Sequence, residues 1–129
     1  MYERILVTGS TGFLGHHLMP RLKSAFPKAE IIGVGRRDAD LLEPGAPARL
    51  LRNTQPDCVV HMAAKSGGII TNIKRPAEFF YENVVMNTHM LHDAQQAGVK
   101  KFVTFMGGCS YPSDARSPID ESQMWAGYP

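Results

Sequence analysis

The sequence has little of what marks several specialised protein classes. Of its 129 residues only two are cysteine, Cys58 and Cys109, which excludes a disulfide-stapled secreted domain and predicts two reduced thiols. No apolar run approaches the roughly 20 residues needed to cross a bilayer, and the chain enters an apolar strand too early to leave room for a secretory signal. The net charge is only +2 and dispersed, so neither a nucleic acid nor a membrane is expected as a partner. We therefore expect a cytoplasmic protein.

What the sequence does contain is a repeated strand–helix order. Short apolar runs typical of buried parallel strands lie at 4–8, 31–35, 58–62 and 102–106. Helical patterns separate them, at about 12–25, 46–52 and 76–97. The last helix is the best marked, because Pro76 suits its first turn, Gly98 follows its end, and apolar residues recur at helical spacing: Phe79, Phe80, Val84, Met90 and Leu91. The order predicts an α/β fold, a Rossmann-type doubly wound parallel sheet with helices on both faces.

The remaining segments are expected to be irregular. Residues 66–73 are predicted to form a loop leaving the third strand, and no regular element is predicted from Ser110 onward. Pro20 should kink the first helix or be tolerated inside it. The sheet then stops after about four strands and leaves an open edge. Either a second copy of the chain pairs with this edge or the tail folds back over it.

The most informative stretch is the turn at 8–15, which reads TGSTGFLG between the first strand and the first helix. Gly9 permits a tight turn, Gly12 lets backbone amides approach a diphosphate, and Gly15 lets the helix pack close to the sheet. The phosphates would lie at the positive end of the helix. Residues 1–129 are therefore predicted to form an NAD(P)-binding domain, and the cofactor residues expected from this turn are Gly9, Thr11, Gly12, Phe13, Leu14 and Gly15.

The end of the second strand bears on which cofactor binds. An acidic residue there would bind the ribose hydroxyls of NAD, whereas this chain has Arg36 and Arg37, which suit the 2′-phosphate of NADP. Asp40 and Leu41 are placed beside the adenosine. NADP is favoured, and NAD stays possible because Asp38 or Asp40 could reach a ribose.

The third strand and the long helix contribute further candidates. Ala63 and Ala64 are small enough for the backbone to lie against the cofactor, with Lys65 beside them, whereas His61 is interpreted as a packed histidine. In the helix, Asn83 and Asn87 either hydrogen-bond to backbone near the site or are simply exposed. No metal site is assigned.

These motifs together resemble the extended short-chain dehydrogenase/reductase family of NAD-dependent epimerases and dehydratases. The resemblance rests on T-G-x-x-G-F-x-G at 8–15, HMAA at 61–64 and GVKKFV at 98–103. The stretches KSGGI at 65–69, PAEF at 76–79, CSYP at 109–112 and PIDE at 118–121 resemble the GDP-L-fucose synthase branch.

This resemblance implies an NADP-dependent enzyme that epimerises and reduces a GDP-4-keto-6-deoxy sugar and forms a homodimer through the long helix. It places Arg36 at the 2′-phosphate and Cys109 at the acid/base position of the epimerisation. Gly107 stands where the family has its catalytic serine, so that Ser110 or a shifted loop would have to substitute.

The sequence departs from the family at its catalytic dyad as well. No tyrosine here is followed by lysine four residues on, so the Tyr-x-x-x-Lys pair that would transfer the proton is missing from these 129 residues. We expect the amino-terminal, cofactor-binding part of a longer enzyme, which as it stands binds cofactor weakly or not at all and does not turn over. An NAD-dependent UDP-hexose 4-epimerase or dehydratase and a non-catalytic dinucleotide-binding module are the alternatives.

Overall fold

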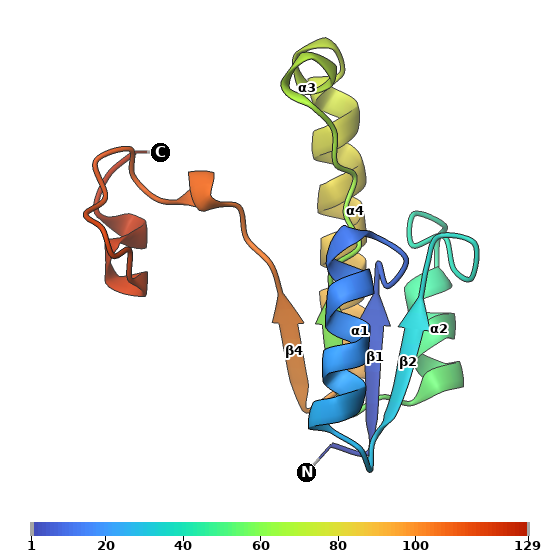
Figure 1. Cartoon of the computed structure of the whole chain (residues 1–129). Helices are drawn as coiled ribbons and strands as arrows, with labels where there is room; N and C mark the ends of the chain where they lie inside the picture. The colour runs from blue at the N-terminus through green and yellow to red at the C-terminus, as the bar shows by residue number, and fades with distance from the viewer. Residues whose placement is uncertain (1, 129) are drawn as a thin grey trace.

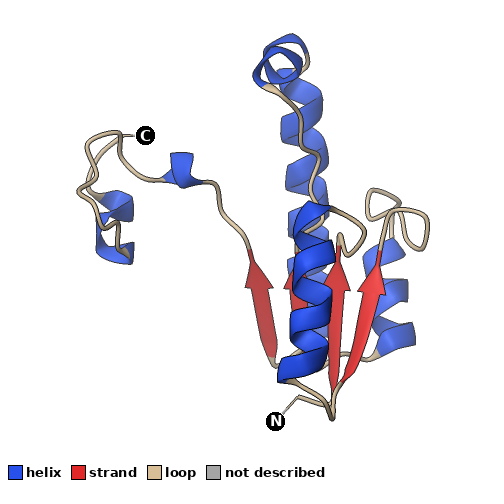
Figure 2. Cartoon of the chain, viewed as in Figure 1, coloured by secondary structure: helices blue, strands red, loops and turns tan. Residues whose placement is uncertain are grey.

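The computed structural model describes residues 2–128 and shows a parallel sheet with helices on both faces (Figure 1). The strands are β1 (Arg4–Thr8), β2 (Glu30–Val34), β3 (Cys58–His61) and β4 (Lys101–Thr104). They lie in the order β2-β1-β3-β4, and Figure 2 shows their arrows pointing the same way. Parallel neighbours require crossovers, which the helices supply. The predicted α/β fold class is confirmed.

The fourth strand is shorter at its carboxyl end than the expected 102–106. It pairs with β3 up to the register partners His61 and Thr104, where β3 itself ends. Phe105 and Met106 therefore have no neighbouring strand to continue the ladder, and their side chains are exposed. The apolar run marked the strand correctly, but the length of its partner determined where it stops.

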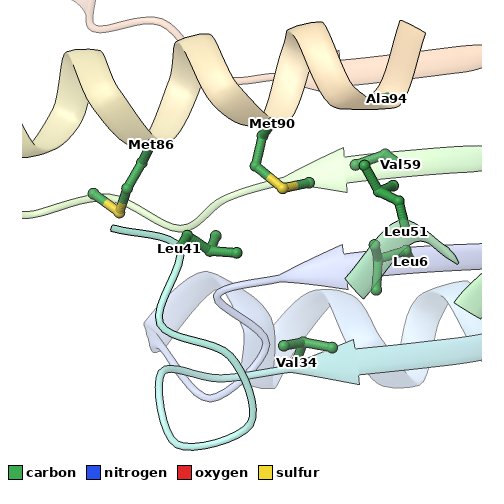
Figure 3. Close-up of a cluster of buried hydrophobic side chains, with 8 residues drawn as sticks. All are labelled: Leu6, Val34, Leu41, Leu51, Val59, Met86, Met90 and Ala94. Atoms are coloured by element: carbon green, nitrogen blue, oxygen red, sulfur yellow. The ribbon is translucent and has the colours of Figure 1, made fainter. Parts of the chain in front are cut away.

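Helices cover the two faces of the sheet unequally. Helix α1 (Phe13–Ala25) lies on one face and continues through Pro20, whereas α2 (Ala46–Thr54) and α4 (Pro76–Gln96) lie on the other (Figure 1). Figure 3 shows the core between the sheet and the second pair, formed by Leu6, Val34, Leu41, Leu51, Val59, Met86, Met90 and Ala94. Burial of these apolar side chains holds the carboxyl ends of β1, β2 and β3 in fixed positions.

Helix α4 carries two apolar faces, although a single one was expected. It buries Phe79, Met86, Met90 and Ala94, but the apolar residues Phe80, Val84 and Leu91 are exposed. The group of apolar residues recognised in the sequence by their helical spacing therefore includes members of both faces. The predicted helix end is confirmed, because Gly98 has φ +74° and the N–H of Val99 donates to Ala94 O at 3.0 Å.

The prediction that residues 66–73 form a loop is wrong. The segment leads into helix α3 (Ile69–Lys74). The side chain of Asn72 donates to the carbonyls of Gly67 and Gly68, at 2.8 and 3.1 Å, and this secures the first turn. The helix has only six residues, fewer than a periodicity argument needs, and its apolar residues Ile69, Ile70 and Ile73 are exposed.

The segment beyond β4 extends away from the sheet (Figure 1). It contains two short 3₁₀ helices, η1 (Gly108–Ser110) and η2 (Glu121–Trp125), where no regular element was predicted. Among the described residues only β3 pairs with β4, so the tail leaves the outer edge of β4 uncovered. Of the two alternatives for this edge, the tail folding back is therefore not what the structure shows.

Candidate functional site

The turn after β1 is built from backbone contacts that glycine makes possible. Gly9 has φ +71°, and a Cβ added there would lie 2.8 Å from the backbone nitrogen of Ala63. The N–H of Ser10 donates to Val34 O at 3.2 Å, and the N–H of Gly12 donates to Gly9 O at 3.1 Å. The turn thus joins the carboxyl ends of three neighbouring strands.

Helix α1 begins immediately after this turn without a side-chain cap. Gly12 is its N-cap residue, no side chain accepts from its first turn, and that turn has no acidic residue. The first-turn N–H groups and the positive end of the helix dipole are therefore available to an anion. Gly15 allows a close approach, because a Cβ there would lie 2.1 Å from Ser10 O. The atoms nearest to this position belong to the turn itself, at Ser10.

A cleft of about 500 Å³ opens at this end of the sheet. Its volume falls within the usual range of small-molecule sites, roughly 300–1,000 Å³. Predicted cofactor residues that line it are Gly9, Thr11, Gly12, Phe13, Leu14, Arg36, Asp40, Leu41, Ala63, Ala64 and Lys65. Sequence reasoning missed other lining residues: Val34, Gly35, Ala39, Leu42, Met62, Ser66, Glu82, Met86 and Phe105. Several of these neighbour predicted residues, but the α4 residues Glu82 and Met86 carry no local signal.

The loop after β2 uses its charged residues in different ways. Asp38 accepts the N–H of Gly35 at 2.8 Å and is therefore engaged in the turn. The guanidinium of Arg36 lies 3.5 Å from the Asp40 carboxylate and is 72% exposed, so this is a weak surface pair. Arg36 faces the cleft, where its charge can be redirected to a phosphate.

A second hollow of about 440 Å³ adjoins the cleft on the side of Arg36. The predicted residue Arg37 lines this hollow and not the main cleft. Arg49 of α2 also lines it, with its guanidinium 3.4 Å from Glu43. Sequence reasoning missed Arg49, because only the packing of α2 brings it beside the β2 loop. The hollow thus gathers three arginines around one end of the cleft.

The loop after β3 is fastened to α4 by Asn83. Its side chain accepts the N–H of Lys65 at 2.8 Å and donates to Lys65 O at 3.0 Å. This confirms the first of the two alternatives for Asn83, whereas Asn87 is exposed and bonds only to its own helix. The asparagine thereby fixes the backbone that forms one wall of the cleft.

The ammonium of Lys65 is already occupied by two carboxylates. It lies 3.2 Å from oxygens of both Glu78 and Glu82. The hydrogen bonds that Lys65 donates to Glu78 and, to a lesser extent, to Glu82 raise the pKa of Lys65, and the same lysine lowers the pKa of Glu78. Lys65 therefore contributes backbone to the cleft wall while its charge points to α4.

His61 is a buried histidine, as expected, and it is paired across two strands. It is 2% exposed, and its Nδ1 lies 2.7 Å from the hydroxyl of Thr8. The N–H of Ala63 donates to that hydroxyl at 3.3 Å. Burial lowers the pKa of His61 to about 4. The ring is therefore neutral at physiological pH.

The catalytic candidates lie apart from the cleft lining. Cys109 is exposed, and both it and Ser110 belong to η1, beyond β4. Neither lines the cleft, although Phe105 from the same connection does. The geometry of the described chain thus provides a place for an elongated anionic ligand and does not bring the two catalytic candidates onto it.

Neither a metal centre nor a membrane segment is found in residues 2–128. No group of at least three histidine, cysteine or acidic side chains is arranged to hold a metal ion. In the same residues no helix has the length and apolar character to span a bilayer.

The parallel sheet, glycine turn and adjoining cleft define a Rossmann-type dinucleotide-binding fold. The chain belongs to the NAD dependent epimerase/dehydratase family, whose sequence profile matches residues 5–127. It is 33% identical over 128 residues to a probable GDP-L-fucose synthase of Drosophila melanogaster, covering 98% of this chain and 40% of that protein. The chain thus spans about 40% of the length of the curated relatives it matches.

Solved structures of related enzymes share this fold. A GDP-L-fucose synthetase from Naegleria fowleri bound to NADP has a TM-score of 0.81 and 30% identity, covering 97% of this chain and 37% of that one. A GDP-D-glycero-L-gluco-heptose synthase from Campylobacter jejuni, solved in the presence of NADPH, has a TM-score of 0.84 and 27% identity, covering 97% and 36%. The relatives named here are enzymes of GDP-sugars.

Proposed function

We propose that this chain is the cofactor-binding portion of a nucleotide-sugar epimerase/reductase similar to GDP-L-fucose synthase, and that it binds NADP(H). The observation that carries the proposal is the uncapped start of α1, which opens on a cleft that also contains Arg36. An anion-binding helix terminus and a guanidinium at the β2 end match the diphosphate and the 2′-phosphate of this cofactor.

Each part of the cleft has a role in this proposal. The first-turn amides of α1 bind the diphosphate, and Arg36 exchanges its weak pair with Asp40 for the 2′-phosphate. The backbone at Ala63 and Ala64 lies along the cofactor, held in place by its neighbour Lys65 through Asn83. When bound, NADPH supplies a hydride for reduction of a sugar carbon.

The chemistry of the intact enzyme would be epimerisation and reduction of GDP-4-keto-6-deoxy-mannose, with Cys109 as the acid/base of the epimerisation. In this chain Gly107 provides no hydroxyl at the serine position, and the sequence contains no Tyr-x-x-x-Lys. We therefore expect weak binding of cofactor without turnover. A homodimer is proposed for the whole protein, formed through the second apolar face of α4 with Phe80, Val84 and Leu91.

The test is a calorimetric titration of the chain with NADPH and with NADH, followed by an assay for NADPH oxidation in the presence of the 4-keto sugar nucleotide. We expect NADPH to bind more tightly than NADH and its absorbance to stay constant. Absence of binding to either nucleotide contradicts the proposed site, and NADPH consumption contradicts the expected inactivity.

The same titrations, together with one further experiment, distinguish two alternatives. Tighter binding of NADH favours an NAD-dependent UDP-hexose 4-epimerase or dehydratase. A non-catalytic dinucleotide-binding module is favoured by Gly107 and the missing dyad. Binding of NADPH together with restored turnover on adding Tyr-x-x-x-Lys sequence from a relative would argue against the module.

A further inference from the structure

Two cofactor-contacting loops meet at one point of the sheet. The turn after β1 and the loop after β3 approach there so closely that a Cβ on Gly9 would lie 2.8 Å from Ala63 N and 2.9 Å from Met62 C. Gly9, Met62 and Ala63 all line the cleft. A small displacement of one loop relative to the other would therefore change the cleft wall.

A side-chain relay crosses this contact. The hydroxyl of Thr8, the last residue of β1, lies 2.7 Å from Nδ1 of His61, the last residue of β3. The same oxygen accepts the N–H of Ala63 at 3.3 Å. One hydroxyl thus connects the histidine ring to the backbone of the cleft wall.

The hydrogen-bonding capacity of these groups indicates which ring nitrogen carries the proton. Thr8 has one hydroxyl hydrogen, and Nδ1 of His61 is its one acceptor among the described hydrogen bonds. If Nδ1 carried the proton, the Thr8 hydroxyl hydrogen would lose its acceptor, and Nε2 would be an unprotonated acceptor without a donor. Nε2 is buried without a partner in the described chain in either case. The Nε2–H tautomer leaves fewer groups unsatisfied, and it makes Nδ1 an acceptor.

The surroundings keep the ring uncharged. It is 2% exposed, lies beside Phe102 with 5.9 Å between ring centroids, and has no ion pair with any described carboxylate. A neutral acceptor at the end of β3 is thus enforced by the fold.

We propose that His61 is a positioning residue for the cofactor cleft: its Nδ1 accepts a hydrogen bond from the Thr8 hydroxyl, which directs a lone pair of that oxygen toward the N–H of Ala63 and holds the β1 and β3 loops together. The effect on cofactor affinity depends on the proposed NADP(H) site, whereas the relay itself does not. Nothing in this role requires His61 to touch the cofactor.

The experiment uses the full chain, four single variants and one double variant. His61→Asn keeps an acceptor oxygen near the Nδ1 position, His61→Leu removes it, and Thr8→Val removes the hydroxyl. His92→Leu, at an exposed position of α4, is the matched control. Long-range proton–nitrogen NMR reports the tautomer, hydrogen exchange reports the Ala63 amide, and titration with NADP⁺ reports the cleft.

In the parent chain we expect Nδ1 of His61 to be unprotonated and Nε2 to be protonated. In His61→Leu and Thr8→Val, exchange at Ala63 should be at least fivefold faster and NADP⁺ should bind at least threefold more weakly. His61→Asn and His92→Leu should stay within twofold of the parent. The double variant Thr8→Val/His61→Leu should be no worse than Thr8→Val alone, because both changes interrupt one relay.

Different failures have different meanings. A protonated Nδ1, or unchanged Ala63 exchange in His61→Leu, overturns the positioning role whatever the cofactor does. A parent chain that binds no NADP⁺ overturns the proposed function, while the tautomer and exchange data still decide the relay. Equal losses in His61→Asn and His61→Leu would show a general packing role and also overturn it.

Discussion

Arg36 is held only loosely before any ligand arrives. Its guanidinium is largely exposed and lies 3.5 Å from Asp40, a pair of the kind that contributes about 0–1 kcal/mol. A phosphate offers more charge and a forked pattern of acceptors, so it should displace the carboxylate.

Replacing Arg36 with alanine should therefore affect one cofactor and spare the other. We expect Arg36→Ala to weaken NADPH binding about ten- to a hundredfold, corresponding to the loss of about 1.5–3 kcal/mol of charge-assisted hydrogen bonding. NADH binding should change less than about twofold. Parallel calorimetric titrations measure both, with Arg52→Ala on the exposed surface of α2 as control. Equal weakening of NADPH and NADH binding would show that Arg36 does not bind the 2′-phosphate.

His61 gives the fold a pH dependence of definite sign. Burial lowers the pKa of its ring from 6.5 to about 4, so the unfolded chain binds the proton at higher pH than the folded chain does. This contribution to stability is complete above about pH 6.5 and is lost as the pH falls toward about 4, by about 3 kcal/mol in total.

The free energy of unfolding, measured with urea between pH 7.5 and pH 5, should fall with acidification in the parent chain. His61→Leu should flatten this fall, and His92→Leu should retain it, because His92 is exposed. The same slope in all three proteins would show that other groups cause it.

At the scale of elements, the start of α1 depends on close contact between helix and turn. Gly15 lies within the helix, where alanine would ordinarily be favoured by about 1 kcal/mol. A Cβ there would nevertheless meet the Ser10 backbone at 2.1 to 2.6 Å, which neither segment can relieve without moving.

We expect Gly15→Ala to destabilise the chain by about 2–3 kcal/mol, in spite of the helix propensity. Gly68→Ala is the matched control, because no atom lies within 4 Å of its added Cβ, and it should cost less than about 1 kcal/mol. Thermal and urea unfolding measure both variants. A neutral or stabilising effect of Gly15→Ala would contradict the close contact described between Gly15 and the Ser10 backbone.

At the scale of the whole molecule, residues 2–128 leave one strand edge open and several apolar side chains exposed. The outer edge of β4 has no partner strand within residues 2–128, and the strip Phe80, Val84 and Leu91 on α4 faces away from the core. Contiguous apolar surface of this kind favours association. The proposed homodimer would bury the strip on α4.

We expect the chain to associate in a concentration-dependent manner and Val84→Lys to shift it toward monomer, because the substitution places a charge inside the strip that the dimer would bury. Gln96→Lys, at an exposed position of α4 outside the strip, should leave association unchanged. Light scattering over a range of concentrations provides the measurement. A monomer at every concentration, or a dimer unaffected by Val84→Lys, would contradict the proposed interface.

Local sequence was sufficient wherever the deciding interaction is local. The strands followed from short apolar runs, the turn at 8–15 from its glycines, and the end of α4 from Gly98, whose φ of +74° an ordinary residue rarely adopts. Helix α3 was missed because six residues are too few to show a periodicity, and β4 was predicted too long because its end depends on β3.

The sequence by itself indicated the family, the fold class and the glycine turn before α1, because each was inferred from short motifs whose own residues lie within a few positions of one another. The tertiary structure alone decided which side chains meet: Thr8 with His61 across 53 positions, Lys65 with Asn83 across 18, and Arg49 beside Arg36. Sheet register and helix packing set those distances, and no local pattern encodes them.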